Sequence, residues 1–173
     1  HGGKVVAASA VSGVGVSEYG LGGAALAGHI AATGAIEGFA GGEAIDNQDL
    51  FEVDCDILIP AAGGSQITAD NAAKITARII AEGANSPTTP SADDLLNDKD
   101  VFIIPDILCN AVGVVVSYLA YTQETQHEQM TLQQVETSPR ERMRQCFAEV
   151  YDYTTDTGTI TRLAALDLPL LRQ

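Results

Sequence analysis

The sequence predicts an α/β protein of the Rossmann-like, doubly wound type, with a mostly parallel sheet and additional helices toward its carboxyl end. Short apolar runs typical of buried strands alternate with helix-length segments, and this alternation favours a parallel sheet covered by helices. Two such runs, residues 77–81 and 101–104, are each followed by small or amide side chains. Because open α/β sheets bind ligands at the carboxyl ends of their strands, the sequence predicts a ligand site at this edge.

The composition is that of one folded domain with an acidic surface. The chain has 173 residues, 46% of them apolar and 18% charged, which is enough to bury a sizeable core. Its 23 acidic and 9 basic residues give a net charge of −14, which argues against nucleic acid and anionic membrane surfaces as partners. A salt-rich habitat and an ordinary acidic cytosolic protein both fit this charge.

The cysteines and histidines give no sign of a metal site. Cys55, Cys109 and Cys146 are far apart and odd in number, which favours reduced thiols and a cytoplasmic location. The three histidines lack metal-ligand spacing, and no apolar run reaches the roughly 18 residues of a membrane helix. His1 is not an initiator methionine and a strand-like run follows it closely, so the chain is expected to begin inside a domain.

The first third of the chain is rich in glycine. Apolar residues recur at helical spacing before Gly34, and Asp46 is expected to cap a short helix. The predicted elements, in order, are a buried strand over 4–8, a loop over 11–23, a small-residue helix over 21–33, a loop with a brief strand over 36–45, and a short helix over 47–52.

The middle of the chain alternates strands with helices. Thr68 is a good N-cap, and Thr89 followed by Pro90 is typical of an N-cap and the first helical position. The predicted elements are a strand over 55–59 ended by Pro60, a helix over 69–76, a strand over 77–81, a helix over 90–99, and a strand over 101–104 ended by Pro105.

The carboxyl-terminal part is predicted to be helical. A long helix is expected over 107–126 with an interruption at Gly113, and a second over 131–153. Ser138 with Glu141 three residues later is a capping-box pattern, so the second helix can restart there. The stretch from Thr154 onward is rich in Thr and Leu, and its pattern sets no element bounds.

Several short motifs follow one another in a fixed order, and together they are far more specific than any one alone. They are Cys-Asp-Ile-Leu-Ile-Pro-Ala-Ala at 55–62, Gln-Ile-Thr at 66–68, Asn-Ala at 71–72, Ala-Glu-Gly-Ala-Asn at 81–85, Pro-Thr-Thr-Pro at 87–90, Pro-Asp-Ile-Leu at 105–108, Asn-Ala at 110–111 and Val-Ser-Tyr at 116–118. In this order they closely resemble the nucleotide-binding domain of glutamate dehydrogenases, in the family that includes leucine, phenylalanine and valine dehydrogenases. The resemblance implies a partial NAD(P)-binding Rossmann-like domain over 1–126 and a C-terminal helical segment over 127–173.

The resemblance implies an oxidoreductase that converts glutamate to 2-oxoglutarate and ammonia with NAD or NADP, in a homo-oligomer that is a hexamer in the family. An amide side chain offers the donor and the acceptor that the carboxamide of nicotinamide needs. On the residues alone, an Asn after a strand is often only a turn residue, and a helical Ser often bonds its own backbone. The implied sites are Ala61 and Ala62 beside the ribose and nicotinamide, Asn85 and Asn110 in the nicotinamide region, and Val114 and Ser117, on one helix face, lining the glutamate side-chain pocket.

Some positions depart from the family pattern. Ser9, an implied cofactor contact, and Ala10 stand where the family has an acidic residue near the adenosine ribose, so NAD versus NADP stays open. Val112 replaces a glycine and adds bulk near the nicotinamide. Gly-rich residues 13–15 and 20–23 lack the spacing of a phosphate-binding fingerprint and are more typical of turns.

Parts of the family's domain have no counterpart in this sequence. They are the first strand with its glycine fingerprint and the family's catalytic lysines and aspartate. Strands 4–8 and 55–59 are therefore expected to flank a gap and to expose apolar edges.

Two hypotheses about function follow. In the first, the chain is a fragment of glutamate dehydrogenase that supplies part of the nucleotide-binding domain and is inactive alone, because no general base can be assigned. In the alternative, it is a non-catalytic remnant that acts as a binding or assembly module. Asp106, the one well-placed acid, is predicted to cap the helix that follows it.

Overall fold

The computed structural model describes residues 2–126 and 132–171. The chain divides into two compact units. The first comprises His1–Asp56 and Ala69–Ala77, and the second comprises Ile57–Thr68 and Arg78–Gln173. The division into a partial Rossmann-like domain over 1–126 and a C-terminal helical segment over 127–173 stays a prediction.

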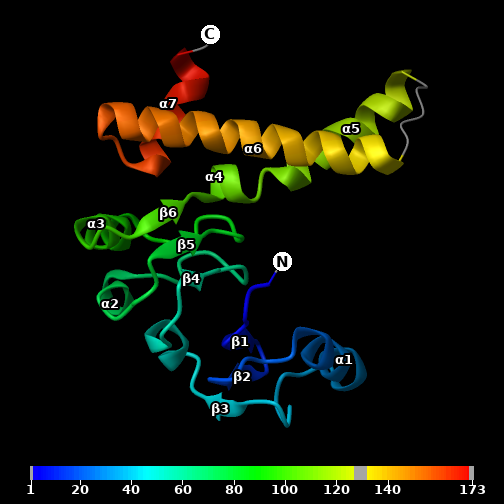
Figure 1. Cartoon of the computed structure of the whole chain (residues 1–173), viewed down its shortest axis with the longest axis vertical. Coiled ribbons are helices and arrows are strands. Elements are labelled where there is room, and N and C mark those ends of the chain that lie inside the picture. The colour runs from blue at the N-terminus through cyan, green and yellow to red at the C-terminus, as the bar shows by residue number, and fades with distance from the viewer. Residues whose placement is uncertain (1, 127–131, 172–173) are drawn as a thin grey trace. The chain divides into compact units, whose positions relative to one another are not determined.

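The first unit is built on a small antiparallel sheet (Figure 1). Its strands are β1 (Ala7–Ala10), β2 (Gly13–Val16) and β3 (Glu43–Ile45), in that order. Helix α1 (Gly23–Thr33) ends at Gly34, whose left-handed backbone (φ 76°) lets its N–H bond the carbonyl of Ile30. This C-cap is the one the sequence predicts. The core of this unit is Leu21, Leu26 and Ile36.

Several expectations for this unit are wrong. The run predicted as a buried strand over 4–8 becomes β1, which begins only at Ala7 and pairs antiparallel with β2. Residues 13–16, predicted as loop, form β2, because Gly13 takes a φ of 140° after a tight turn and Val14 is then buried. The predicted helix over 47–52 is a single 3-10 turn, η1 (Asp49–Glu52), with Gln48 rather than Asp46 at its N-cap. The helix predicted over 69–76 shortens to α2 (Ala69–Ala72).

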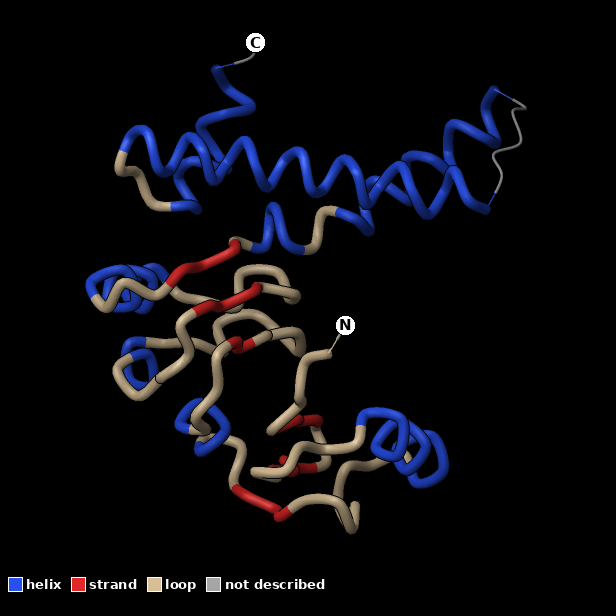
Figure 2. The backbone as a smooth tube through the Cα atoms, viewed as in Figure 1, coloured by secondary structure: helices blue, strands red, loops and turns tan. Residues whose placement is uncertain are grey.

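The second unit contains a parallel sheet, which confirms the predicted fold class (Figure 2). Strands β4 (Ile57–Leu58), β5 (Ile79–Ala81) and β6 (Phe102–Ile104) lie side by side in chain order. They are shorter than predicted. Helix α3 (Pro90–Asp98) joins β5 to β6, with Thr89 at its N-cap position. Because the strands are parallel, their carboxyl ends lie at one edge of the sheet.

In the part of the chain that the structure describes, four helices follow the sheet. They are α4 (Asp106–Cys109), α5 (Val112–Gln126), α6 (Leu132–Thr157) and α7 (Thr161–Leu171). The side chains of Leu108, Val150, Ala164 and Ala165 form a buried cluster among α4, α6 and α7. Helix α7 lies within the predicted C-terminal helical segment, but its bounds were not predicted, because its buried positions are the small residues Thr161, Ala164 and Ala165, which give a weak apolar pattern.

The helix boundaries also differ from prediction. The helix predicted over 107–126 is two helices that break at Asn110, not at Gly113. The predicted start of the next helix at Thr131 lies outside the described residues. Helix α6 runs unbroken through Pro139, so the predicted restart at Ser138 does not occur.

Strand β4 lies at one edge of the parallel sheet. Ile57 is 53% exposed and Ile59 is 63% exposed, in agreement with the expected apolar edge. Among the residues that the structure describes, no helix has the length and apolar character needed to cross a bilayer.

Candidate functional site

The carboxyl ends of β5 and β6 bring two amide side chains together. Asn85 lies four residues after β5, and Asn110 directly follows α4, the helix that begins two residues after β6. Nδ2 of Asn110 donates a hydrogen bond to Oδ1 of Asn85 over 2.7 Å. Asn85 is exposed and Asn110 is half-buried. The two residues predicted to contact nicotinamide therefore form one polar pair at the predicted edge of the sheet.

Small residues border this edge. Ala61 and Ala62 follow β4 and are exposed. The N–H of Ala84 donates to the carbonyl of Pro60 over 2.9 Å, which fixes the loop after β4 against the loop after β5. A Cβ atom at Gly83 would lie only 3.1 Å from Cβ of Ala61. Larger side chains at these positions would push the two loops apart.

The loop that carries Asn85 is held on its far side. The N–H of Ser65 donates to the carbonyl of Ser86 over 2.8 Å, and the N–H of Ile67 donates to the carbonyl of Pro87 over 2.9 Å. Ile67 and Pro87 have almost no exposed surface. Asn85 is thus an exposed side chain on a backbone with little freedom to move.

A cluster of charges centred on Arg162 of α7 adjoins the loops that carry the two amides. Its guanidinium donates two hydrogen bonds to Glu82, of 2.9 and 2.7 Å, and two to Asp93, of 3.0 and 2.9 Å. Oδ1 of Asp106 lies 3.7 Å from its Nη1. The side chain of Glu82 is fully buried, and that of Arg162 is 23% exposed. The guanidinium of Arg162 therefore lies within ion-pair distance of three carboxylates.

The charge state of Arg162 follows from these contacts. Burial alone would lower the pKa of Arg162, but hydrogen bonds to Glu82 and Asp93 raise it well above its ordinary value. The residue is a permanent cation. Removing it would leave the buried charge of Glu82 uncompensated, a change that costs about 3–5 kcal/mol in comparable pairs.

Asp106 links this cluster to the backbone around the amides. Its Oδ2 accepts the N–H of Ser86 over 2.7 Å and its Oδ1 accepts the N–H of Ile107 over 2.8 Å, while its own N–H donates to Glu82 over 2.9 Å. The prediction that Asp106 is the N-cap of the following helix is wrong. Pro105 occupies the N-cap of α4, and Asp106 is the first residue of the helix. Asp106 instead joins the loop after β5 to the loop after β6.

Sequence reasoning missed Arg162. The available signal was Glu82, an acidic residue that directly follows a buried strand and so requires a cation nearby. Nothing local in the sequence indicates that this cation lies 80 residues later.

The other predicted site residues belong to α5 and to β1. Val114 and Ser117 are exposed on α5, and the Ser117 hydroxyl donates to the carbonyl of Gly113 over 2.9 Å. Ser9 lies exposed in β1, opposite Val14, and belongs to the first unit. The proposed ligand contacts of these residues stay predictions.

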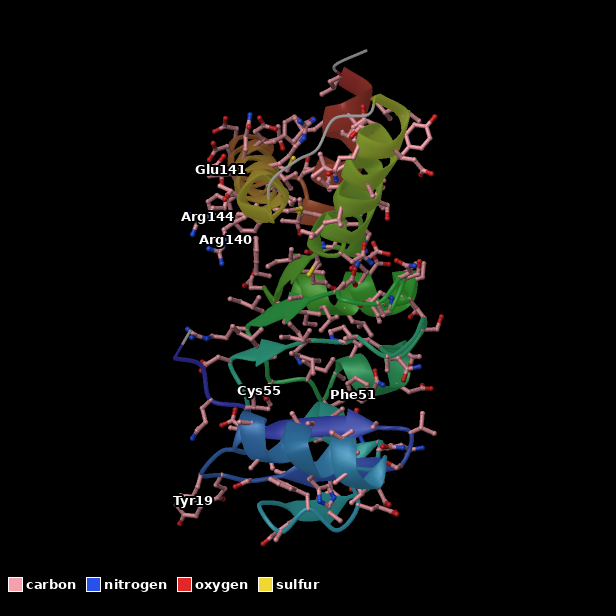
Figure 3. All side chains as sticks on the ribbon, turned by 90° about the vertical axis from the view of Figure 1, so that its right-hand side faces the viewer. Tyr19, Phe51, Cys55, Arg140, Glu141 and Arg144 are labelled. Atoms are coloured by element: carbon pink, nitrogen blue, oxygen red, sulfur yellow. The ribbon has the colours of Figure 1, made fainter. Side chains whose placement is uncertain are left out.

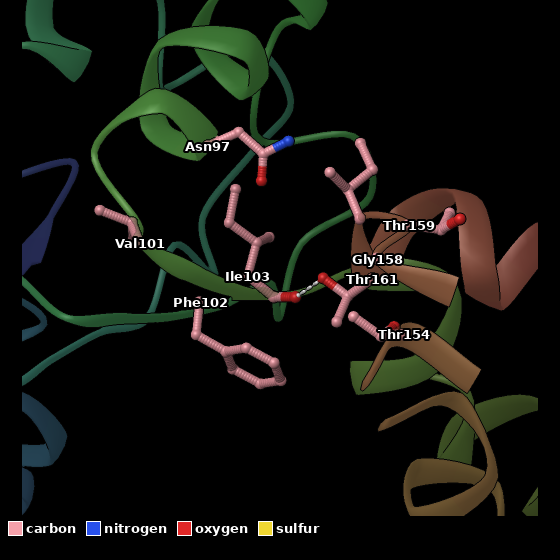
Figure 4. Close-up of a pocket in the computed structure, with 9 residues that line it drawn as sticks. Asn97, Val101, Phe102, Ile103, Thr154, Gly158, Thr159 and Thr161 are labelled. Carbon is pink, nitrogen blue, oxygen red and sulfur yellow. Dashed lines mark hydrogen bonds between the residues drawn. The ribbon is translucent and has the colours of Figure 1, made fainter. Parts of the chain in front are cut away.

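Two hollows in the second unit do not include the amides. A cavity of about 200 Å³ is bounded by β6 and the α6–α7 connection, where Thr161 donates to the carbonyl of Ile103 (Figure 4). A groove of about 810 Å³ between α5 and α6 is lined in part by Val112 and Arg144, with Arg140 and Arg144 projecting from the same side of α6 (Figure 3). Val112 thus contributes to this groove.

The described residues contain no group of three or more His, Cys, Asp or Glu side chains arranged to hold a metal ion.

Comparisons with known proteins agree on one family. The family model described as Glutamate/Leucine/Phenylalanine/Valine dehydrogenase matches residues 1–171. The NAD-specific glutamate dehydrogenase of Staphylococcus aureus (strain COL) is 41% identical over 130 residues, covering 75% of this chain and 31% of that protein. The glutamate dehydrogenase of Thermotoga maritima is 40% identical over 138 residues, covering 78% and 33%. The chain therefore spans about a third of the length of these relatives.

Solved structures give the same result for the fold. The hetero-hexameric glutamate dehydrogenase from Thermus thermophilus, in its Leu-bound form, matches with a TM-score of 0.88 and 25% identity, over 98% of this chain and 40% of that one. The glutamate dehydrogenase of Plasmodium falciparum matches with a TM-score of 0.79 and 24% identity, over 94% and 37%.

Proposed function

The chain belongs to the glutamate/leucine/phenylalanine/valine dehydrogenase family, and on this premise we propose that it forms part of the surface that binds NAD or NADP in a glutamate dehydrogenase. The reaction proposed for the whole protein is the oxidative deamination of glutamate to 2-oxoglutarate and ammonia. The relative from Thermus thermophilus is a hetero-hexamer, and we propose that this chain also associates with further subunits.

The observation that carries the proposal is the pair of amides at the sheet edge. Once Asn110 Nδ2 has bonded Asn85 Oδ1, Nδ2 of Asn85 and Oδ1 of Asn110 have no partner among the described residues. A primary carboxamide carries one acceptor oxygen and one NH₂ donor, so the pair offers the complementary groups. The small side chain of Ala61, packed closely against the backbone of Gly83, keeps bulky side chains away from this edge.

The bound nicotinamide would supply the hydride-accepting chemistry. The residues of this chain are proposed to bind and orient the nicotinamide. Asn85 and Asn110 are proposed to fix the carboxamide and thereby the plane of the ring. Ser117 is proposed to donate to the side-chain carboxylate of glutamate. Since its one hydroxyl proton is directed at the carbonyl of Gly113, Ser117 must release that hydrogen bond to do so.

A direct test compares cofactor binding by three variants of the chain. The variants N85A and N110A are expected to weaken NADH binding roughly fivefold to tenfold each, the effect of losing one hydrogen bond. The chain contains no tryptophan, so the fluorescence of bound NADH is read without tryptophan background. N47A, which removes an exposed amide from the first unit, is the matched control. Equal affinity in all three variants and the parent chain would contradict the proposal, and a parallel titration with NADPH compares the two cofactors.

We further propose that these 173 residues alone do not turn over glutamate, since no general base for the reaction is assigned among them. The measurement is glutamate-dependent reduction of NAD or NADP by the isolated chain. Clear turnover would refute this proposal and leave the proposed cofactor contacts untouched.

A further inference from the structure

Arg162 connects the loop after β5, which carries Asn85, to the loop after β6, which leads to Asn110. Glu82, directly after β5, lies three residues before Asn85, and its carboxylate accepts hydrogen bonds from both terminal nitrogens of Arg162. The same carboxylate accepts the N–H of Asp106, which lies four residues before Asn110. One guanidinium thus fixes the starts of two separate loops through a single buried anion.

A second hydrogen bond joins the two loops directly. Asp106 accepts the N–H of Ser86, the residue directly after Asn85. The carbonyl of Asp106 accepts the N–H of Asn110 over 3.0 Å. The backbone on both sides of the Asn85–Asn110 hydrogen bond is therefore anchored to residues that touch Arg162 or its partner Glu82.

A role in packing alone does not account for this arrangement. Arg162 is satisfied by Glu82 and Asp93, and α7 is already attached to β6 by Thr161 and by the buried residues Ala164 and Ala165. The additional approach to Asp106, at 3.7 Å, brings the cation to the residue that connects the two loops. The planar fork of an arginine can bridge several carboxylates at fixed distances, which an ammonium group cannot do.

We propose that Arg162 is a positioning residue that sets the spacing of β5 and β6 at which Asn85 and Asn110 hydrogen-bond to each other. It acts through Glu82 and Asp106 and touches neither the cofactor nor the substrate. Its relevance to catalysis rests on the proposed function, in which the paired amides orient nicotinamide. The positioning itself is measurable without any cofactor.

The test reads the side-chain amide of Asn110 by NMR in the complete 173-residue chain. In R162M the exchange of the Asn110 NH₂ protons with solvent is expected to rise roughly fivefold to tenfold, the factor corresponding to one lost hydrogen bond. R162K keeps a positive charge beside Glu82, so it preserves folding better, yet it lacks the fork and is expected to show a smaller rise of the same kind. R142M removes the same charge from an exposed position on α6 and is expected to leave the signal unchanged.

The outcomes separate the two proposals. An unchanged Asn110 amide in folded R162K or R162M overturns the positioning role, whatever the stability of the variant. Faster exchange together with weaker NADH binding supports both the positioning role and the proposed function. Faster exchange with unaltered NADH binding upholds the positioning role and counts against nicotinamide as the ligand of the amides.

Discussion

At the scale of single residues, the site combines exposed amides with a buried ion cluster. Asn85 and Asn110 present polar groups to solvent at low cost, since water can satisfy them in the absence of a ligand. Glu82 is fully buried and requires the guanidinium of Arg162. The exposed residues are placed to bind, and the buried ones hold them in position.

The pKa of the Cys109 thiol, next to Asn110, depends on burial and on the nearby carboxylates. Burial raises the pKa of its thiol, and the negative charges of Glu82 and Asp106 raise it further. The folded pKa therefore exceeds the unfolded one. The stability that this contributes is fully present below the unfolded pKa and is lost as the pH rises through the folded pKa.

We expect alkylation of Cys109 by iodoacetamide to reach half its maximal rate at a higher pH than the ordinary thiol pKa of about 8.5. Peptide mapping by mass spectrometry measures the rate at each pH. The same chain unfolded in urea is the control, because its thiol titrates normally. A folded and an unfolded chain with the same midpoint would contradict the raised pKa.

At the scale of elements, the sequence predicts the parallel sheet well and the flanking elements less well. Strands such as the one predicted over 101–104 are apolar runs ended by proline. This local pattern predicts a strand, and the structure has β6 there. Strand β2 depends on the φ of Gly13 and on pairing with β1 and β3, which no local pattern contains. The contact between Asn85 and Asn110 was predictable because both follow parallel strands, whereas the contribution of α7 was not.

Helix α7 is held by close packing of small residues. Ala164 has no exposed surface, so A164V is expected to overpack the interface and reduce the free energy of unfolding by about 1–3 kcal/mol. Urea denaturation measures the change. A120V, at an exposed position on α5, makes the same substitution and is expected to cost less than about 1 kcal/mol. Equal losses in the two variants would show that Ala164 is not tightly packed.

At the scale of the whole molecule, the surplus of acidic residues is the dominant property. The acidic side chains behind the net charge of −14 repel one another. The exposed pair of Lys74 and Glu52 at 2.6 Å offsets little of this repulsion in water. Opposite charges do meet in a largely buried cluster at Arg162 and Glu82.

Salt is therefore expected to raise the melting temperature of the chain. Between about 0.1 M and 1 M NaCl the Debye length falls from about 10 Å to about 3 Å, which screens the repulsion. Thermal unfolding followed by circular dichroism measures the shift, and sucrose of equal osmolarity controls for effects of exclusion from the surface. A melting temperature that falls or stays constant with added NaCl would contradict this expectation.

The long sequence separation within the ion cluster has a consequence for synthesis. Arg162 follows Glu82 by 80 residues, so a ribosome makes the carboxylate well before it makes the guanidinium. The nascent strand β5 emerges with an acidic end that is not yet neutralised and that resists burial until α7 is translated. We therefore expect the amide edge to close late in the synthesis of this polypeptide.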